Sequence, residues 1–330
     1  MKENCLVIGV GGIGLRHLRC LKKINKFHVY IYDIKKPNLN LLITEKLADD
    51  ILFDLEEINN LNLKFVIISS PSNTHFNYSK TCYLNNIHFL LEKPVMNNLD
   101  FSKDLLNLDK KSKIKSAVAF PRRFSKGINK IKSLLSDNEL GKIFLIRGNF
   151  SQDFRKYRPD FQKTYYSKIS NGGGIIQDAL PHYIDLFMYF FGRVYSHSSV
   201  ASKNSFQNVE GNDYINTNLI FENGVQGEIS CNQYQKPNYD VIEIIGEMGN
   251  IIFDRILNTL TIKKTDNIND DIVMSFDDDW DEIFYNQLKY FINCIENNKD
   301  VRTSIRCGIE NLKLIHSILN SRNNYQAVEY

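Results

Sequence analysis

A cluster of glycines near the start of the chain has the spacing of a phosphate-binding turn. Gly9, Gly11 and Gly14 form a G-x-G-x-x-G pattern, with Gly12 and Ile13 inside it, directly after an apolar run and at the start of an amphipathic segment. Gly9 permits a tight turn, Gly11 lets a pyrophosphate approach the backbone, and Gly14 lets the helix lie close to the strand. The N–H groups at the helix N-terminus attract the anion. The pattern predicts a dinucleotide site.

An acidic residue follows where such a site needs one. Asp33 lies at the end of the second predicted strand, about 20 residues beyond the turn, where a carboxylate accepts a hydrogen bond from a ribose hydroxyl. Its charge repels the 2′-phosphate of NADP. We therefore predict NAD as the cofactor and NADP as the less favoured one, although Lys35 and Lys36 weaken this preference.

Three further motifs place polar and charged residues after predicted strands or at a helix start. They are Ser69-Ser70-Pro71-Ser72-Asn73-Thr74-His75, His88-Phe89-Leu90-Leu91-Glu92-Lys93-Pro94, and Gly173-Gly174-Ile175-Ile176-Gln177-Asp178 followed by His182-Tyr183-Ile184-Asp185. Together with the glycine turn, they resemble the Gfo/Idh/MocA oxidoreductase family, whose members act on sugars, inositols and nucleotide-linked sugars. The resemblance covers essentially the whole chain.

The resemblance implies a two-domain fold. Residues 1–120 are expected to form an NAD(P)-binding Rossmann domain with a doubly wound parallel sheet. Residues 121–330 are expected to form a substrate-binding α+β domain with an open, mainly antiparallel or mixed sheet that builds homodimers or homotetramers. The last helix, about residues 302–319, is expected to pack back on the first domain.

The resemblance also assigns catalytic roles. Lys93 matches the family's catalytic lysine, with a cis bond expected before Pro94, and Asp178 and His182 match its acidic and histidine positions. Histidine has a pKa suited to accepting the hydroxyl proton while hydride leaves for nicotinamide. Lys93 would stabilise the developing alkoxide or relay a proton, and Asp178 would orient His182 or Lys93. Without the resemblance, Asp178 could simply be a cap or a first-turn acid of the helix that begins near Pro181.

The remaining site predictions concern binding. Cofactor contacts are expected from Gly9, Gly11, Gly12, Ile13, Gly14, Asp33, Ser70, Pro71, Asn73, His75 and Glu92, and substrate contacts from Arg123, Tyr157, Arg158 and Asp185. The arginines could hold a diphosphate or a sugar carboxylate, while a solvated basic loop is the alternative. Tyr165 and Tyr166 could offer hydroxyls to a sugar, but 17 tyrosines in the chain make the choice of one arbitrary.

Residues 157–161 resemble a stretch of family members from bacterial surface-sugar pathways. The leading hypothesis is therefore an NAD-dependent dehydrogenase or reductase acting on a secondary alcohol or ketone of a nucleotide-linked or related sugar in surface-polysaccharide biosynthesis. A free-sugar or inositol dehydrogenase and a catalytically silent NAD-binding sensor or scaffold are the alternatives. Leu180 stands where family members commonly have glycine; if that glycine makes room for substrate, Leu180 is expected to narrow or reshape the pocket.

The composition agrees with this reading. A chain of 330 residues with 43% hydrophobic and 24% charged residues is typical of a globular protein of two domains. A net charge of +3 is too small for a nucleic-acid partner. Apolar runs too short for a membrane span, and a start without a signal region, predict a cytoplasmic protein. Six scattered cysteines are expected to be reduced and mostly buried, with no metal site.

Two different arrangements of elements must position these residues. Short β-branched runs at residues 6–8, 29–32, 65–68, 89–91 and 117–119, with helical spacing between them, predict parallel strands. After about Phe120, runs at 143–150, 214–221, 224–233, 241–245, 250–253 and 259–262 predict an antiparallel or mixed sheet. Further helices are predicted over residues 181–191, 281–296 and 302–319, and Asn98 and Asp100 are expected to start a helix through Leu105.

Overall fold

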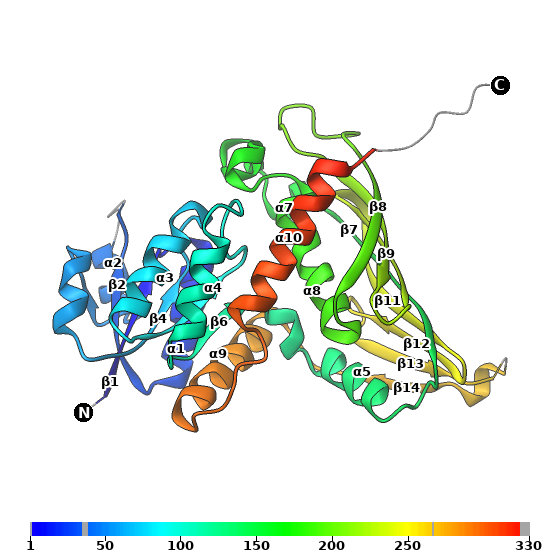
Figure 1. Cartoon of the computed structure of the whole chain (residues 1–330), viewed down its shortest axis with the longest axis horizontal. Helices are drawn as coiled ribbons and strands as arrows, with labels where there is room; N and C mark the ends of the chain where they lie inside the picture. The colour runs from blue at the N-terminus through cyan, green and yellow to red at the C-terminus, as the bar shows by residue number, and fades with distance from the viewer. Residues whose placement is uncertain (1, 35–38, 266, 324–330) are drawn as a thin grey trace. The chain divides into compact units, whose positions relative to one another are not determined.

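The computed structural model describes residues 2–34, 39–265 and 267–323. The chain folds into two compact units (Figure 1). Unit 1 consists of Met1–Phe124 and Asp279–Leu312, and unit 2 of Ser125–Asp278 and Lys313–Tyr330. The long helix α10, Ile305–Ser321, therefore contributes its first half to unit 1 and its second half to unit 2.

Unit 1 is built on a parallel sheet of six strands in the order β3-β2-β1-β4-β5-β6. The strands are β1 (Glu3–Ile8), β2 (Phe27–Tyr32), β3 (Asp50–Ile51), β4 (Leu63–Ile68), β5 (His88–Glu92) and β6 (Ser116–Ala119). The order reverses between β1 and β4, and in such sheets ligands bind beyond the carboxyl ends of the strands at the reversal. The predicted Rossmann sheet is confirmed.

Both faces of this sheet are buried, which explains the continuous apolar runs of its strands. Cys5 and Val7 of β1 belong to one hydrophobic cluster, while Leu6 and Ile8 belong to another. The helices of unit 1 are α1 (Gly12–Ile24), α2 (Leu39–Thr44), α3 (His75–Leu84), α4 (Ser102–Lys111), α9 (Trp280–Glu296) and the first half of α10. Ile305, Ile309 and Leu312 of α10 lie in the same cluster as Val118 of β6.

Unit 2 is built on a mixed sheet of eight strands in the order β14-β13-β12-β11-β7-β10-β9-β8. The strands are β7 (Ile143–Asp153), β8 (Val194–Ser202), β9 (Tyr214–Phe221), β10 (Gln226–Asn232), β11 (Tyr234–Gly246), β12 (Gly249–Asp254), β13 (Thr259–Lys263) and β14 (Ile272–Ser275). Only β7 and β10 pair in parallel; the other pairs are antiparallel, as predicted.

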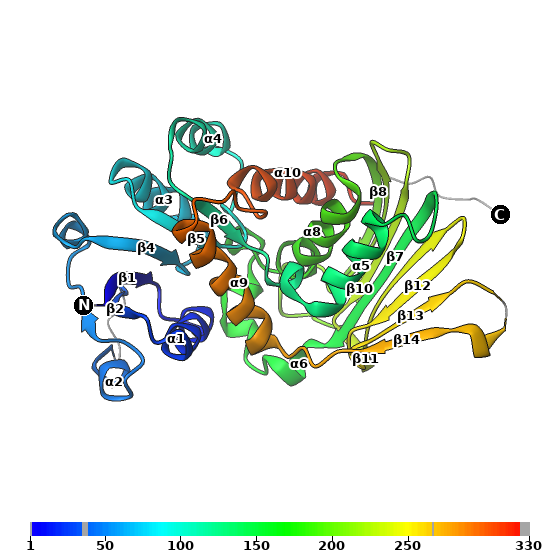
Figure 2. The same cartoon turned by 90° about the horizontal axis from the view of Figure 1, so that it is seen from below.

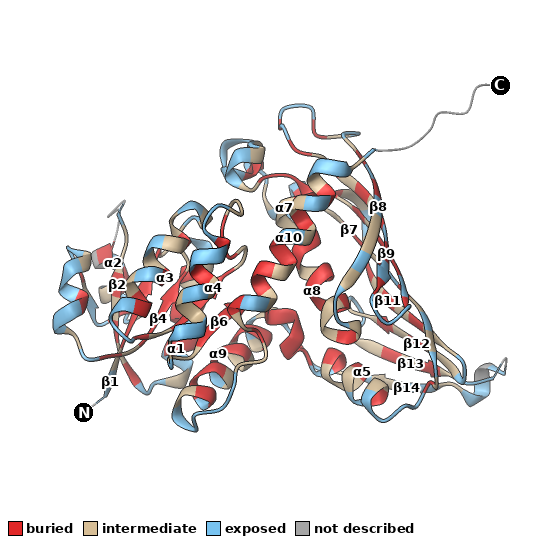
Figure 3. Cartoon of the chain, viewed as in Figure 1, coloured by how far each residue is buried: buried red, intermediate tan, exposed pale blue. Residues whose placement is uncertain are grey.

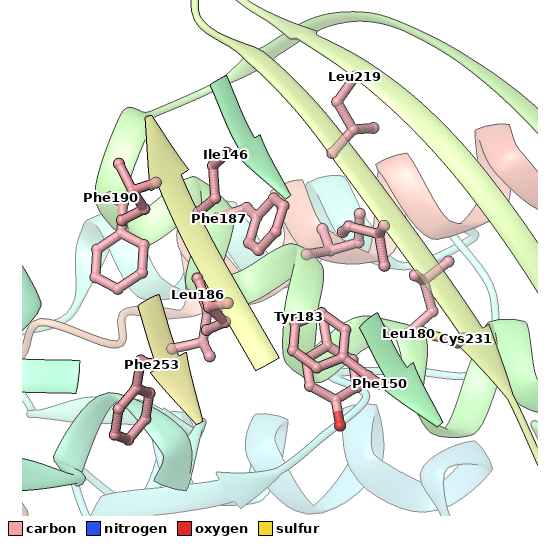
Figure 4. Packing of buried hydrophobic residues seen from close by; sticks show 14 of the residues in the cluster. Ile146, Phe150, Leu180, Tyr183, Leu186, Phe187, Phe190, Leu219, Cys231 and Phe253 are labelled. Carbon is pink, nitrogen blue, oxygen red and sulfur yellow. The ribbon is translucent and has the colours of Figure 1, made fainter. Parts of the chain in front are cut away.

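Helices cover one face of the unit 2 sheet (Figure 2). They are α5 (Lys126–Ser136), α7 (Ile175–Asp178) and α8 (Leu180–Phe191), joined by the second half of α10, whereas α6 (Phe154–Tyr157) places Phe154 in a separate small cluster. Figure 3 shows buried residues along α8. Figure 4 shows Phe187 and Tyr183 of α8 packed beside Ile146 and Phe150 of β7. Tyr183 stacks on Phe150 with an interplanar angle of 13°.

Short 3₁₀ turns complete the chain. They are η1 (Leu55–Asn60), η2 (Ser72–Thr74), η3 (Pro121–Phe124), η4 (Phe161–Lys163), η5 (Tyr165–Ser167), η6 (Ile169–Asn171) and η7 (Ile268–Asp270). The turns η4 and η5 contribute Phe161 and Tyr166 to a small separate cluster of buried residues, formed by Phe154, Phe161, Tyr166, Phe206 and Val209, which we call the satellite cluster.

Several elements differ from the sequence predictions. Strand β8 was not predicted, because its sequence is rich in serine. It forms as an edge strand by antiparallel pairing with β9. Helix α5 was not predicted either: Gly127 lowers its helix propensity, but Ser125 caps its start by accepting from the Ile128 N–H. Helix α4 begins at Ser102, because Asn98 instead accepts from the Asp100 N–H in a local turn.

The predictions for cysteine are confirmed: Cys5, Cys20, Cys82, Cys231 and Cys294 are buried free thiols, and Cys307 is half-buried. Within the described residues, no group of histidine, cysteine and acidic side chains could hold a metal ion. No helix among the described residues has both the length and the hydropathy needed to cross a membrane.

Candidate functional site

The glycine turn lies at the carboxyl edge of the unit 1 sheet, between β1 and α1. Gly9 has a φ of +85°, and a Cβ there would lie 2.6 Å from the Ser70 backbone nitrogen. A Cβ on Gly14 would lie 2.0 Å from the Gly9 carbonyl oxygen. By contrast, a Cβ on Gly11 or Gly12 would meet nothing within 4 Å. Gly9 and Gly14 are therefore required by close packing, whereas Gly11 and Gly12 border open space.

That open space suits a dinucleotide. Helix α1 begins at Gly12 with no side-chain cap on its first turn, where N–H groups have no intrahelical partner. Asp33 follows β2, the strand next to β1, and its Oδ2 accepts a hydrogen bond of 2.9 Å from the Val10 N–H. Open space beside Gly11 and Gly12, a helix N-terminus and an acid thus occur at one sheet edge, which fits the predicted NAD site. Lys35 and Lys36 lie outside the described residues.

The segment after β4 borders the same edge, since β4 pairs with β1. Ser70 is half-buried and its hydroxyl lies 2.7 Å from that of Thr74, while Pro71 and Asn73 are exposed. His75 is 1% exposed, and its ring nitrogens lie 2.8 Å from the carbonyl oxygens of Ser70 and Pro94. Burial lowers the pKa of His75, and the two carbonyls oppose that effect. His75 therefore links two loops from inside the fold.

Lys93 follows β5, the next strand along this edge, and the Lys93–Pro94 bond is cis, as expected. Lys93 is half-buried, and the preceding Glu92 is 8% exposed. Glu92 Oε1 lies 2.7 Å from Nε2 of His17, a fully buried residue of α1. Glu92 thus joins the Lys93 strand end to the helix that carries the glycine turn. Through this contact Glu92 stabilises the sheet edge at the predicted cofactor site. A direct contact between Glu92 and the cofactor stays a prediction.

Asp178 and His182 belong to unit 2 and lie about one helical turn apart, on either side of the junction between α7 and α8. Both are half-buried. The second glycine cluster positions α7: Gly174 has a φ of +81°, and a Cβ there would lie 2.8 Å from the Gly211 Cα. The Ile175 N–H then donates to the Asn212 carbonyl at 2.9 Å. These glycines are required where two backbone segments touch.

The Asp178 carboxylate has a tyrosine partner. The Tyr165 hydroxyl donates to Asp178 Oδ1 at 2.8 Å, and Arg158 Nη1 donates to the same hydroxyl at 2.7 Å. Partial burial of the phenol, followed by the nearby Asp178 charge, raises the pKa of Tyr165. Tyr165 therefore stays a neutral hydrogen-bond donor.

Most of the chain matches two family models. Residues 3–120 match the model described as "Oxidoreductase family, NAD-binding Rossmann fold", and residues 132–330 match "Oxidoreductase family, C-terminal alpha/beta domain". The chain belongs to the Gfo/Idh/MocA oxidoreductase family. Unit 1 therefore carries the NAD-binding Rossmann domain of this family, and the protein is an oxidoreductase.

Relatives within the Gfo/Idh/MocA family match nearly the whole chain. Myo-inositol 2-dehydrogenase of Thermotoga maritima is 27% identical over 304 residues, 89% of this chain and 88% of that protein. Scyllo-inositol 2-dehydrogenase (NAD(+)) of Bacillus subtilis is 25% identical over 99% of this chain and 96% of that protein. A solved levoglucosan dehydrogenase in complex with NADH has a TM-score of 0.87 at 19% identity, covering 97% of both chains, and shows the same fold.

Three of the residues that were predicted to contact the substrate of this Gfo/Idh/MocA enzyme differ in how deeply they are buried and in what they contact. Arg123 is 5% exposed and its Nη1 donates to the Arg302 carbonyl at 2.8 Å. Tyr157 is exposed, and its hydroxyl accepts from the Asn238 side chain. Asp185 is 2% exposed. Direct substrate contacts by these residues stay predictions.

The expectation for Leu180 was wrong. Leu180 is fully buried within the hydrophobic core of unit 2, where Figure 4 shows it near Cys231. Helix α8 begins at Leu180, and its side chain faces the sheet. The residue therefore fills the core and does not narrow an open pocket in this unit.

Sequence reasoning did not select Tyr165 or His17. Nothing in the spacing of tyrosines distinguishes Tyr165 from the others, and His17 and Glu92 are 75 positions apart. The notable signal for His17 was its place on the buried face of α1, beside Leu18 and Leu21.

Asp33→Ser is expected to shift the preference between the cofactors toward NADP by at least about tenfold, because it removes the charge that repels a 2′-phosphate. Asp33→Asn is the matched control, since its amide oxygen still accepts from the Val10 N–H. Because Asn also lacks the negative charge, we expect it to keep the turn and still shift the preference toward NADP as Ser does. The ratio of kcat/KM with NAD to kcat/KM with NADP measures this preference. An unchanged ratio in Asp33→Ser would show that Asp33 does not distinguish the ribose of NAD from the phosphorylated ribose of NADP.

Proposed function

We propose that the protein is an NAD-dependent dehydrogenase that oxidises a secondary alcohol of a free sugar or cyclic polyol, or reduces the matching ketone. One observation carries this proposal: the two relatives matched over nearly their full lengths are named inositol 2-dehydrogenases. These relatives favour the free-sugar or inositol alternative over the nucleotide-linked sugar that the sequence suggested first.

The arginines support the same choice. Arg123 and Arg158 were candidates for holding a diphosphate, but Arg123 is buried against the Arg302 carbonyl and Arg158 donates to the Tyr165 hydroxyl. Each arginine thus already uses part of its guanidinium in a contact within the fold. An uncharged polyol needs no arginine for its recognition, because its hydroxyls are bound by polar side chains.

We propose that Lys93, Asp178 and His182 carry the proton chemistry. NAD, held at the glycine turn and Asp33, supplies the acceptor for hydride. His182 accepts the proton of the reacting hydroxyl. The Lys93 ammonium stabilises negative charge on that oxygen, and Asp178 compensates the positive charge that arises on His182.

The first experiment measures nicotinamide absorbance when the purified protein is mixed with NAD and a panel of inositols, free sugars, and UDP-, GDP- and CMP-linked sugars. We expect NADH formation with at least one inositol or free sugar. Activity with nucleotide-linked sugars alone would contradict the proposed substrate class. Silence in both directions, with NADH binding confirmed by fluorescence, would favour the sensor alternative.

We also propose that copies of the chain assemble through the unit 2 sheet. Its face opposite to α5 and α8 carries half-exposed apolar side chains at Leu145, Val241, Ile245 and Ile252, and Ile220 is 48% exposed. Apolar side chains that recur on one sheet face are typical of an interface. Sedimentation equilibrium should give two or four times the chain mass of 38.4 kDa; a monomer would contradict the proposal.

We propose a cytoplasmic location. All six cysteines are free, five of them buried, which is typical of a reducing compartment. Fractionation of cells with an antibody to the protein tests this location.

A further inference from the structure

Two consecutive hydrogen bonds in unit 2 lead from Arg158 through Tyr165 to Asp178. Arg158 Nη1 lies 2.7 Å from the Tyr165 hydroxyl, and that hydroxyl lies 2.8 Å from Asp178 Oδ1. The three residues come from three different local elements: the residue after α6, the turn η5, and the end of α7. We call this set the Arg158 relay.

The direction of each hydrogen bond in the Arg158 relay is fixed by chemistry. A guanidinium can only donate, and an ionised carboxylate can only accept. The phenol must therefore accept from Arg158 and donate to Asp178. The arginine charge polarises the phenol O–H and strengthens its bond to the carboxylate.

Tyr165 is held by these bonds more than by packing. Its side chain is 42% exposed, whereas the neighbouring Tyr166 is fully buried in the satellite cluster. The Tyr166 hydroxyl donates to the Gln233 side chain and does not take part in the Arg158 relay. The two adjacent tyrosines thus separate two roles: Tyr166 stabilises the fold, and Tyr165 contacts Asp178.

The local fold places Tyr165 at Asp178. Thr164 caps η5 by accepting from the Tyr166 N–H at 3.3 Å, which directs Tyr166 inward and Tyr165 outward. The Arg158 guanidinium lies 5.8 Å from the ring centre of Phe154, a buried member of the satellite cluster, and 5.4 Å from that of Tyr165. The satellite cluster therefore anchors both donors.

We propose that Tyr165 and Arg158 are positioning residues for Asp178: they hold one carboxylate oxygen in place and thereby orient the acidic group that acts on His182. This inference rests on the proposed function, because it assumes that Asp178 belongs to the catalytic set. It also gives Arg158 a role different from the substrate contact expected from the sequence.

The elevated pKa of Tyr165 agrees with this role. A phenol that remains protonated holds its bond to Asp178 throughout the neutral range, so it acts as a fixed donor and not as a proton carrier. A tyrosine that bound the substrate directly would instead act on substrate affinity.

Tyr165→Phe tests the proposal, with Tyr166→Phe as the matched control. Removing the Tyr165 hydroxyl is expected to lower kcat about tenfold, the effect of losing one hydrogen bond to a charged group, with KM changed less than about twofold. The melting temperature should stay within about 1 °C of wild type, because Tyr165, unlike Tyr166, does not belong to the satellite cluster. Tyr166→Phe should lower the melting temperature by about 2–4 °C and leave kcat within about twofold.

Arg158→Met is the second variant. It leaves the phenol in place but removes the charge that polarises it, so kcat should fall about threefold, in the same direction as for Tyr165→Phe. A rise of tenfold or more in KM at unchanged kcat, in either variant, would overturn the proposal and assign the residue to substrate binding. Equal kcat in Tyr165→Phe and wild type would also overturn it.

A spectroscopic measurement separates this inference from the proposed function, because it needs no substrate. In protein labelled with ¹³C at aspartate carboxyls, the Asp178 signal is identified by its absence from Asp178→Asn. We expect this signal to move in Tyr165→Phe and to stay in Tyr166→Phe. A signal that does not move overturns the Arg158 relay. A signal that moves in a protein inactive on every sugar and polyol would support the Asp178 contact and overturn the proposed function and the catalytic role that depends on it.

Discussion

Lys93→Met is expected to lower kcat at least about 100-fold while the dissociation constant of NADH stays within a few-fold of wild type. The ammonium is proposed to act on charge that appears on the substrate oxygen during hydride transfer. It therefore contributes more to the transition state than to cofactor binding. Initial rates with the substrate found in the panel measure kcat, and quenching of protein fluorescence measures NADH binding.

Lys115→Met is the matched control. Lys115 is also half-buried in unit 1, but it precedes β6 and so lies at the amino edge of the sheet, opposite to the edge where Lys93 follows β5. We expect this variant to keep turnover within about twofold. Normal turnover in Lys93→Met would show that Lys93 has no catalytic role. Loss of NADH affinity in parallel with kcat would make it a cofactor-binding residue.

The sequence predicted the unit 1 sheet because each central strand is buried on both faces and therefore reads as an uninterrupted apolar run. It also predicted the carboxyl edge, since Gly9, Asp33, Ser70 and Lys93 each follow such a run. Neighbouring parallel strands bring their carboxyl ends together, so positions distant in sequence become one edge without any knowledge of side-chain contacts.

Contacts that depend on how separate segments pack could not be predicted in this way. The motif of Glu92 predicts a cofactor contact, which stays a prediction, but it gives no sign that the Glu92 carboxylate lies against His17 of α1. Because Leu180 replaces a family glycine, the sequence suggested that it lines the substrate pocket. However, α8 begins at Leu180, and the side chain points into the hydrophobic core. In both cases the direction of the side chain is set by an element outside the motif.

Tyr165 illustrates the same limit in unit 2. Its position depends on three consecutive 3₁₀ turns that have no hydrophobic period of their own. The first two of those turns are held by the satellite cluster, which joins Phe154, Phe161 and Tyr166 to Phe206 from a separate loop. Only the packed structure distinguishes the exposed Tyr165 from its buried neighbour.

Gly11→Ala and Gly14→Ala are expected to separate cofactor binding from folding at the glycine turn. Gly11 has a φ of −67°, which alanine adopts, and a Cβ there meets no atom within 4 Å. The melting temperature of Gly11→Ala should therefore stay within about 2 °C of wild type. The added methyl group occupies the space that a pyrophosphate needs beside the backbone, so the dissociation constant of NADH should rise at least about tenfold.

In Gly14→Ala, the new Cβ would lie 2.0 Å from the Gly9 carbonyl oxygen, and neither backbone segment can yield cheaply. Overpacking of this kind costs about 1–3 kcal/mol, so we expect both a lower melting temperature and a loss of NADH binding. Thermal unfolding and NADH titration of the two variants side by side measure the difference. If Gly11→Ala bound NADH as tightly as wild type, the open space beside Gly11 would not be where the phosphates of the cofactor lie, and the turn would serve only to pack α1 against β1.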